Sequence, residues 1–166
     1  MGGERETQSD REVAQTRRYP DAAYDFILEG LNAAVEQVHG PLTPAQAFVA
    51  QYMVHEDIDL HEVIERRDAG VLDPAVCKAI DEAGGFEMLN RHVSGQELCW
   101  SLRDCALGRW GPLASVVLQN WGITRTLDFG LVVFSLIERG RLQREPHDRL
   151  EDFGDVFDFK DTLDDA

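Results

Sequence analysis

The stretch VHEDIDLHEVIERRD holds the residues that could most readily bind a metal ion. On one continuous helix His55, Asp59 and Glu62 share a face, because residues three or four apart lie side by side. With His61 nearby, such a set could hold a divalent cation and support a metal-dependent enzyme. The alternative is structural: Asp59 caps a helix, Glu62 is its capping-box partner and His55 ends the preceding helix. We favour this alternative, since the histidines do not have the H-E-x-x-H spacing of zinc proteases.

Other catalytic patterns in the chain are weaker still. The tripeptide at 128–130 reads Asp-Phe-Gly, like the magnesium-binding motif of protein kinases, but no glycine-rich loop precedes it. Ser94 lies close to His92, yet its place before a helical pattern indicates a cap, and no G-x-S-x-G motif occurs. The sequence therefore predicts no catalytic set and no cofactor, and it favours a non-catalytic protein.

Charge and composition narrow the class of partner. The formal net charge is −15, and residues 145–166 hold nine acids against Arg149 and Lys160. An acidic chain repels phosphate backbones, so nucleic acid is disfavoured as a partner. No apolar run is long enough to span a bilayer, and the polar first residues do not form a secretory signal. We expect a cytoplasmic protein with reduced thiols at Cys77, Cys99 and Cys105.

Hydrophobic periodicity and capping signals predict a chain of helices. We expect an arm without order at 1–18, one globular domain at 19–160 and an acidic tail without order at 161–166. Helices are predicted at the following positions: 20–40, three short ones within 41–90, 95–109, 112–121 and 127–139. The predicted caps are Thr43, Asp59, Asp73, Ser94 and Thr126, with Glu97 completing a capping box after Ser94.

The segment WGITRTLDFGLVVFSLIERGRL decides between a DNA-reading helix and a core helix. A short turn with glycine precedes its helix, and the short runs 142–144 and 155–159 could form a β-hairpin after it. This order predicts a mainly α fold with a small β-hairpin, an α+β class with winged-helix-like topology and additional helices. The helix itself is apolar on all sides, which indicates a buried helix. DNA reading through the arginines at 139–144 is therefore the weakest hypothesis.

Two groups of residues could contact a protein partner. Trp100 falls with Arg103 and Leu107 on a polar flank of its predicted helix, and an exposed tryptophan beside arginine is typical of an interface anchor. The C-terminal segment spaces Phe153 and Phe157 through carboxylates, a pattern that could dock on a basic partner or on a second copy. The alternative is that Trp100 packs beneath 41–90 and the phenylalanines hold a terminal strand on the domain.

Several motifs together resemble a family of small uncharacterised bacterial proteins of planctomycete and verrucomicrobial type. They are YPDAAYDFILEGL, HVSGQEL, WGI at 121–123, DFG at 128–130 and the closing pair DF and FDF. The resemblance covers about 19–40 and 91–160, and it implies that 41–90 is a helical insertion. It implies no activity. The function predicted is accordingly a non-catalytic protein–protein interaction module, with a homodimer as one form of that interaction.

Overall fold

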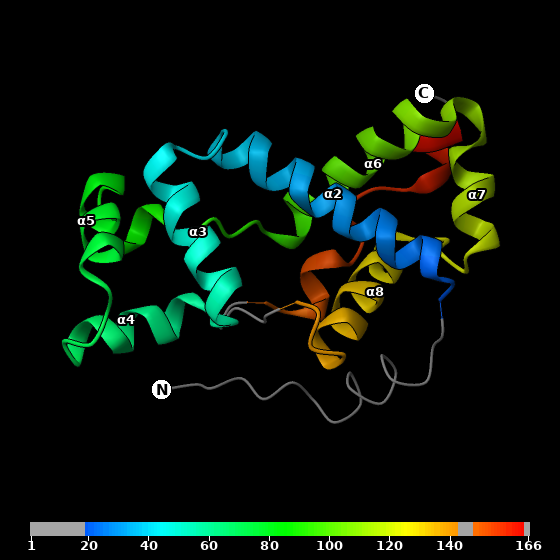
Figure 1. The fold of residues 1–166 in the computed structure, drawn as a ribbon. Helices are drawn as coiled ribbons and strands as arrows, with labels where there is room; N and C mark the ends of the chain where they lie inside the picture. The colour runs from blue at the N-terminus through cyan, green and yellow to red at the C-terminus, as the bar shows by residue number, and fades with distance from the viewer. Residues whose placement is uncertain (1–18, 143–147, 165–166) are drawn as a thin grey trace. The chain divides into compact units, whose positions relative to one another are not determined.

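A computed structural model describes residues 19–142 and 148–164, and every regular element within them is helical (Figure 1). The α-helices are α2 (Asp21–His39), α3 (Pro44–Glu56), α4 (Leu60–Asp68), α5 (Pro74–Ala83), α6 (Gly95–Trp110), α7 (Ala114–Asn120) and α8 (Thr126–Glu138). Four short elements accompany them: the 3-10 turns η1 (Phe86–Met88), η2 (Gly111–Leu113) and η3 (Leu150–Phe153), and the π-helical turn η4 (Lys160–Asp164). None of these helices is long and apolar enough to cross a membrane. The arm predicted at 1–18 lies outside the described residues.

The prediction of a β-hairpin, and with it the α+β winged-helix-like topology, is wrong. Residues 155–158 form a turn and an irregular segment instead of a strand, and 143–147 lie outside the described residues. The Val156 amide donates to the Thr126 hydroxyl at 3.2 Å. The Asp158 carboxylate accepts from the Lys160 amide at 2.8 Å, and thereby starts η4. A segment with alternating apolar and polar residues forms a strand only beside a pairing strand. Here the Val156 amide is bonded to a side chain of the same unit instead.

Most helix ends follow the predicted capping chemistry. Thr43 and Ser94 form complete capping boxes with the glutamine and glutamate three residues on. The Asp59 and Asp73 side chains accept hydrogen bonds from backbone amides in the first turns of α4 and α5. Thr126 is the exception, because it lies inside α8 and its hydroxyl donates to the Phe153 carbonyl at 2.6 Å. This threonine holds the C-terminal segment instead of capping a helix.

The chain divides into two compact units. Unit 1 comprises 1–38 with 93–166, and unit 2 comprises His39–His92. The range of unit 2 nearly coincides with the segment 41–90, which the resemblance suggests as an insertion. Each unit has its own hydrophobic core.

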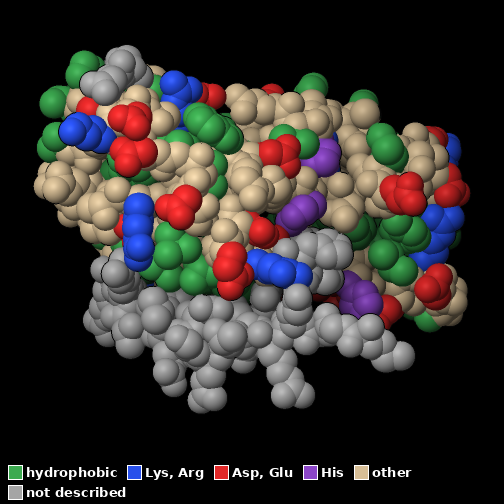
Figure 2. Space-filling model, turned by 180° about the vertical axis from the view of Figure 1, so that it is seen from behind, with side chains coloured by type: hydrophobic (Ala, Val, Ile, Leu, Met, Phe, Trp, Pro, Cys, Tyr) green, Lys and Arg blue, Asp and Glu red, His purple; other side chains and the backbone are tan. Residues whose placement is uncertain are grey.

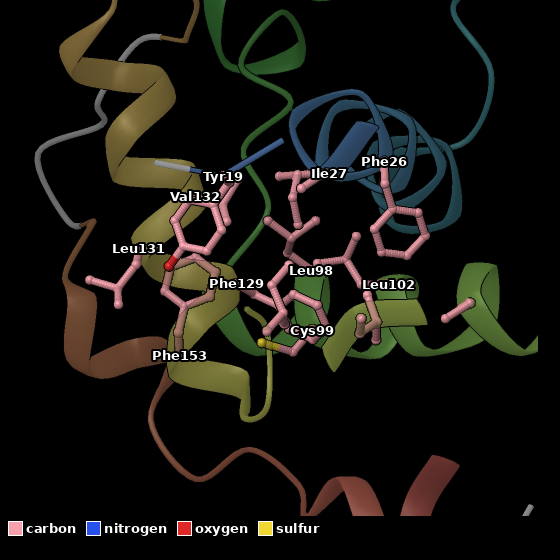
Figure 3. Close-up of a cluster of buried hydrophobic side chains, with 14 of the residues drawn as sticks. Tyr19, Phe26, Ile27, Leu98, Cys99, Leu102, Phe129, Leu131, Val132 and Phe153 are labelled. Atoms are coloured by element: carbon pink, nitrogen blue, oxygen red, sulfur yellow. The ribbon is translucent and has the colours of Figure 1, made fainter. Parts of the chain in front are cut away.

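The core of unit 1 is built mainly by α2, α6 and α8 (Figure 3). Phe129 and Leu102 are 0% exposed, which confirms that the helix after Trp121 is a core helix. Small residues bring α2 and α6 together: the Ser101 hydroxyl donates to the Gly30 carbonyl at 2.9 Å, and a Cβ at Gly30 would lie 2.2 Å from Leu102 Cδ2. Trp110 and Trp121 meet edge to face at 5.3 Å beside Phe26, so both tryptophans pack into this unit.

The C-terminal end of the described chain also packs against the core of unit 1. Residues 161–164, for which the sequence predicted no order, belong to η4, and Leu163 within that turn is 1% exposed. The high density of acids conceals this single apolar contact in the sequence. The C-terminal segment is thus part of unit 1 as far as Asp164.

The core of unit 2 is small and separate. Its buried residues come from α3, α4, α5 and the loop before α5: Val49, Val63, Leu72, Val76, Ala79 and Ile80. Gln46 is buried beside this core, where its side-chain amide donates to the Met88 carbonyl at 2.7 Å. The Arg67 guanidinium lies 5.4 Å from the centre of the Phe86 ring.

Candidate functional site

An exposed tryptophan with an arginine beside it forms the most distinctive surface of unit 1. Trp100 and Arg103 are three residues apart on α6, so their side chains are neighbours on the helix surface. Trp100 is 45% exposed, although tryptophan usually buries most of its surface. The Arg103 guanidinium lies 5.8 Å from the centre of the Trp100 ring and donates to Asp104 at 3.1 Å. The Arg103 Nε atom is buried and makes no hydrogen bond with any residue in the described ranges.

A chain of aromatic rings connects this exposed tryptophan with the core. The Trp100 and Phe157 rings are 4.9 Å apart at 45°, and Phe157 stacks on Phe159 at 5.8 Å. Phe159 in turn lies 5.6 Å from Phe129 of α8. Since Phe129 is 0% exposed, the Trp100 ring is supported from below by packed rings. We call the group of exposed Trp100 with half-buried Arg103 and Phe157 the Trp100 surface.

The other two predicted partner-binding residues do not belong to the Trp100 surface. Phe153 is 6% exposed and packs on α8, where a Cβ at Gly130 would lie 2.7 Å from its ring. Leu107 is half-buried against the core of unit 1. The structure thus brings Trp100, Arg103 and Phe157 together, and it places Phe153 and Leu107 in packing positions.

A pocket of about 600 Å³ opens beside the Trp100 surface, and Phe157 lines both. The pocket lies between α7, the start of α8 and the C-terminal segment. Its lining residues are Ser115, Gln119, Ile123, Thr124, Arg125, Thr126, Leu127, Gly154, Asp155, Phe157, Asp158, Phe159, Lys160 and Asp164. Its volume is within the range of about 300–1,000 Å³ that ligand pockets have. The sequence analysis missed this pocket, because its walls come from segments about thirty to fifty residues apart in the chain.

Some of the polar groups around this pocket are already engaged. The Asp128 carboxylate accepts from the Thr124 and Arg125 amides at 2.9 and 3.3 Å. The Ser115 hydroxyl bonds with the Asp164 carboxylate. The Asp158 carboxylate accepts from the first amides of η4. The exposed side chains of Gln119, Asp155 and Lys160 have no such partner within the described residues, so they are open to a ligand.

The predicted metal residues in unit 2 are held in structural interactions. The Asp59 carboxylate accepts from the Glu62 amide at 2.7 Å, as a cap does. Glu62 pairs with Arg66 at 3.2 Å, and the His61 ring lies 3.1 Å from Glu65. His55 is exposed in the last turn of α3. In the described ranges, no group of three or more His, Cys, Asp or Glu side chains is placed to hold a metal ion.

The thiols in the described residues are not paired, and burial weakens the acidity of two of them. Cys77, Cys99 and Cys105 are all free cysteines. Burial raises the pKa of Cys99 to about 12, because the thiolate loses its hydration in the core. Burial also raises the pKa of Cys105, against a hydrogen bond with Ser101 that lowers it. A thiol that stays protonated at neutral pH is a poor nucleophile and a poor metal ligand.

Two arginines near the ends of α8 contact side chains of their own unit. The Arg139 guanidinium lies 4.5 Å from the centre of the Tyr24 ring, and Arg125 is paired with Asp128 at 3.9 Å. Arg144 lies outside the described residues. On the face that Figure 2 shows, the Lys and Arg side chains drawn in colour lie singly among acidic ones, without a continuous basic patch.

Comparisons of this chain with protein-family models, with curated proteins and with solved structures found no match. The resemblance to a bacterial family therefore stays a prediction.

Proposed function

We propose that this protein is a non-catalytic interaction module that binds another protein through the Trp100 surface. The observation that supports this proposal is the exposure of Trp100 on a rigid support of aromatic rings. Tryptophan and arginine are the residues that most often dominate the energy of a protein interface. An anchor that is already fixed loses little side-chain entropy on binding.

The charges around the Trp100 surface favour a partner with basic groups. Glu97 and Asp104 lie one turn before and one turn after Trp100 on α6, and both are exposed. Asp104 is paired with Arg103, which leaves the net charge of this flank negative. Complementary charge accelerates association and excludes acidic partners. A homodimer through this face would bring like charges together, so we favour a different protein as the partner.

The test is a comparison of wild type with two alanine variants in a pull-down from native lysate. Trp100→Ala removes the anchor, and Leu113→Ala removes an even more exposed apolar side chain that lies outside the Trp100 surface. We expect a discrete protein that is retained by wild type and by Leu113→Ala, and lost with Trp100→Ala. Removal of an anchor of this kind weakens binding by about 2 kcal/mol or more.

Two measurements keep the outcome clear. Thermal unfolding shows whether Trp100→Ala is still folded. A further variant, Arg103→Glu, changes the charge of the Trp100 surface without removing the contact between Trp100 and Phe157. Light scattering of the wild type and Trp100→Ala tests the homodimer. A partner that binds all variants equally would show that the Trp100 surface is not the binding site. A dimer that persists in Trp100→Ala would show that the homodimer does not form through this surface.

A further inference from the structure

We infer that the pocket beside the Trp100 surface binds one large apolar side chain of a basic peptide segment in the partner. This inference rests on the proposed function and specifies the partner of the same site. The pocket and the Trp100 surface share Phe157, so a single peptide segment can contact both.

Apolar side chains line part of the pocket. Phe159 is 9% exposed, and Phe157 and Leu127 are half-buried beside it. The volume of about 600 Å³ exceeds that of one side chain, so the pocket also admits the peptide backbone on either side of it. The apolar side chains in the lining favour a ligand with an apolar end, since burying that end releases water from both surfaces.

The rim of the pocket carries both charges, with carboxylates in excess. Its lining contains three aspartates, Asp155, Asp158 and Asp164, and two basic residues, Arg125 and Lys160. The net charge of the whole chain is −15, and this charge raises the local concentration of cations and repels anions. A small anion bound at Arg125 or Lys160 would have to approach against this field. A segment with Lys or Arg next to its apolar anchor matches the rim.

Asp155 is the rim carboxylate that is best placed to contact such a residue. It is exposed, it accepts none of the hydrogen bonds that engage Asp158 and Asp164, and it has a φ of 50°. Asn tolerates this left-handed conformation as well as Asp does, so Asp155→Asn removes the charge and keeps the backbone. Asp161 lies outside the pocket in the same segment, and Asp161→Asn is a control with the same change in charge.

The experiment uses the full-length protein and a phage-displayed library of random dodecapeptides as the probe. We expect the enriched peptides to share one large apolar residue with Lys or Arg beside it. Fluorescence anisotropy then gives the affinity of one enriched peptide for each variant. Gln119→Trp fills the exposed mouth of the pocket from α7 and weakens binding by about tenfold or more. Val116→Trp places the same ring on the exposed side of α7 outside the pocket and leaves the affinity unchanged.

The charge variants give the second readout. Asp155→Asn weakens binding by about threefold at low salt, while Asp161→Asn has a smaller effect. An acidic consensus, no consensus, or equal affinity for wild type and Gln119→Trp overturns the inference. If the peptides lose affinity with Trp100→Ala but not with Gln119→Trp, the proposed function stands and the pocket is not used. If neither change weakens binding, both proposals fail.

Discussion

Gly130 shows how one residue determines the packing between α8 and the C-terminal segment. A Cβ at this position would lie 2.7 Å from Cγ of the Phe153 ring and 2.9 Å from its Cβ. Alanine favours a helix over glycine by about 1 kcal/mol, but overpacking of a core costs about 1–3 kcal/mol. We therefore expect Gly130→Ala to lower the free energy of unfolding by up to about 2 kcal/mol, measured by urea denaturation.

The matched control for Gly130→Ala is Gly108→Ala in α6. A Cβ at Gly108 would meet nothing within 4 Å, so only the helix propensity changes there. Gly108→Ala is expected to raise the free energy of unfolding by about 0.5–1 kcal/mol. The same sign for both variants would contradict this account of Gly130. The contact also gives the Asp-Phe-Gly tripeptide a structural role, since its glycine makes room for the Phe153 ring.

The buried thiol of Cys99 makes a part of the stability depend on pH. Burial raises its pKa from 9.0 to about 12. In the unfolded chain the thiol ionises near its ordinary value, so between pH 9 and 12 the folded protein holds a proton that the unfolded chain has lost. This contribution is fully present below pH 9 and is lost as the pH rises toward 12. At pH 10 the loss is about 1.4 kcal/mol.

The experiment compares wild type with Cys99→Ala by urea denaturation at pH 7.5 and pH 10. Other groups also titrate in this range, but they are common to both proteins and cancel in the difference. Wild type is expected to lose about 1.4 kcal/mol more than Cys99→Ala between the two pH values. An equal loss would mean that the Cys99 thiol ionises as readily in the folded protein as in the unfolded chain.

At the scale of elements, Thr126 links α8 to the segment that completes the Trp100 surface. Its buried hydroxyl bonds with the Phe153 carbonyl and the Val156 amide. Thr126→Val keeps the shape and leaves these two backbone groups without a partner, which costs about 1–3 kcal/mol. We expect faster hydrogen exchange of the amides in η3 and η4 and a change in Trp100 fluorescence, because Phe157 lies between the two turns.

Thr162→Val is the control for this prediction. Thr162 lies in η4 and is half-buried, and its hydroxyl makes no hydrogen bond with another described residue. Its replacement should leave hydrogen exchange in η3 unchanged. Equal exchange in both variants would show that the Thr126 hydroxyl does not hold the C-terminal segment.

Local signals in the sequence predicted the helices well, because capping and turn chemistry depend on neighbouring residues. The capping boxes at Thr43 and Ser94 are confirmed. The buried face of α2 depends less on local signals: Val38 is 43% exposed, whereas Gly30 and Ala34 are buried. Hydrophobicity alone cannot indicate that small residues face a close neighbour, since the approach of α6 depends on the tertiary fold.

The candidate site could be predicted only where it is local. The spacing of Trp100 and Arg103 on one helix placed both on the same flank, and the structure shows them in contact. The contact of Trp100 with Phe157 joins residues 57 positions apart, and the pocket needs α7, α8 and the C-terminal segment at once. The alternation of aromatic and acidic residues at 155–159 predicted a strand. Nothing in that pattern reveals that the Val156 amide donates a hydrogen bond to the Thr126 hydroxyl.

At the scale of the whole molecule, the two separate cores predict that unit 2 can unfold by itself. Its core has few buried residues, and a compact unit of this size is only marginally stable. Ile80→Ala removes a side chain that is 0% exposed in this core and costs about 2–5 kcal/mol. We expect the amides of α3 and α5 to lose protection from hydrogen exchange, while those of α6 and α8 keep theirs.

Ile27→Ala makes the same substitution in the core of unit 1, where Ile27 is also 0% exposed. It should accelerate exchange in α2, α6 and α8. Because the Trp100 surface belongs to unit 1, its binding should survive Ile80→Ala and be lost when Ile27→Ala unfolds that unit. If either substitution removed protection from both units together, the chain would be a single cooperative structure, and 41–90 would contribute to the stability of the Trp100 surface.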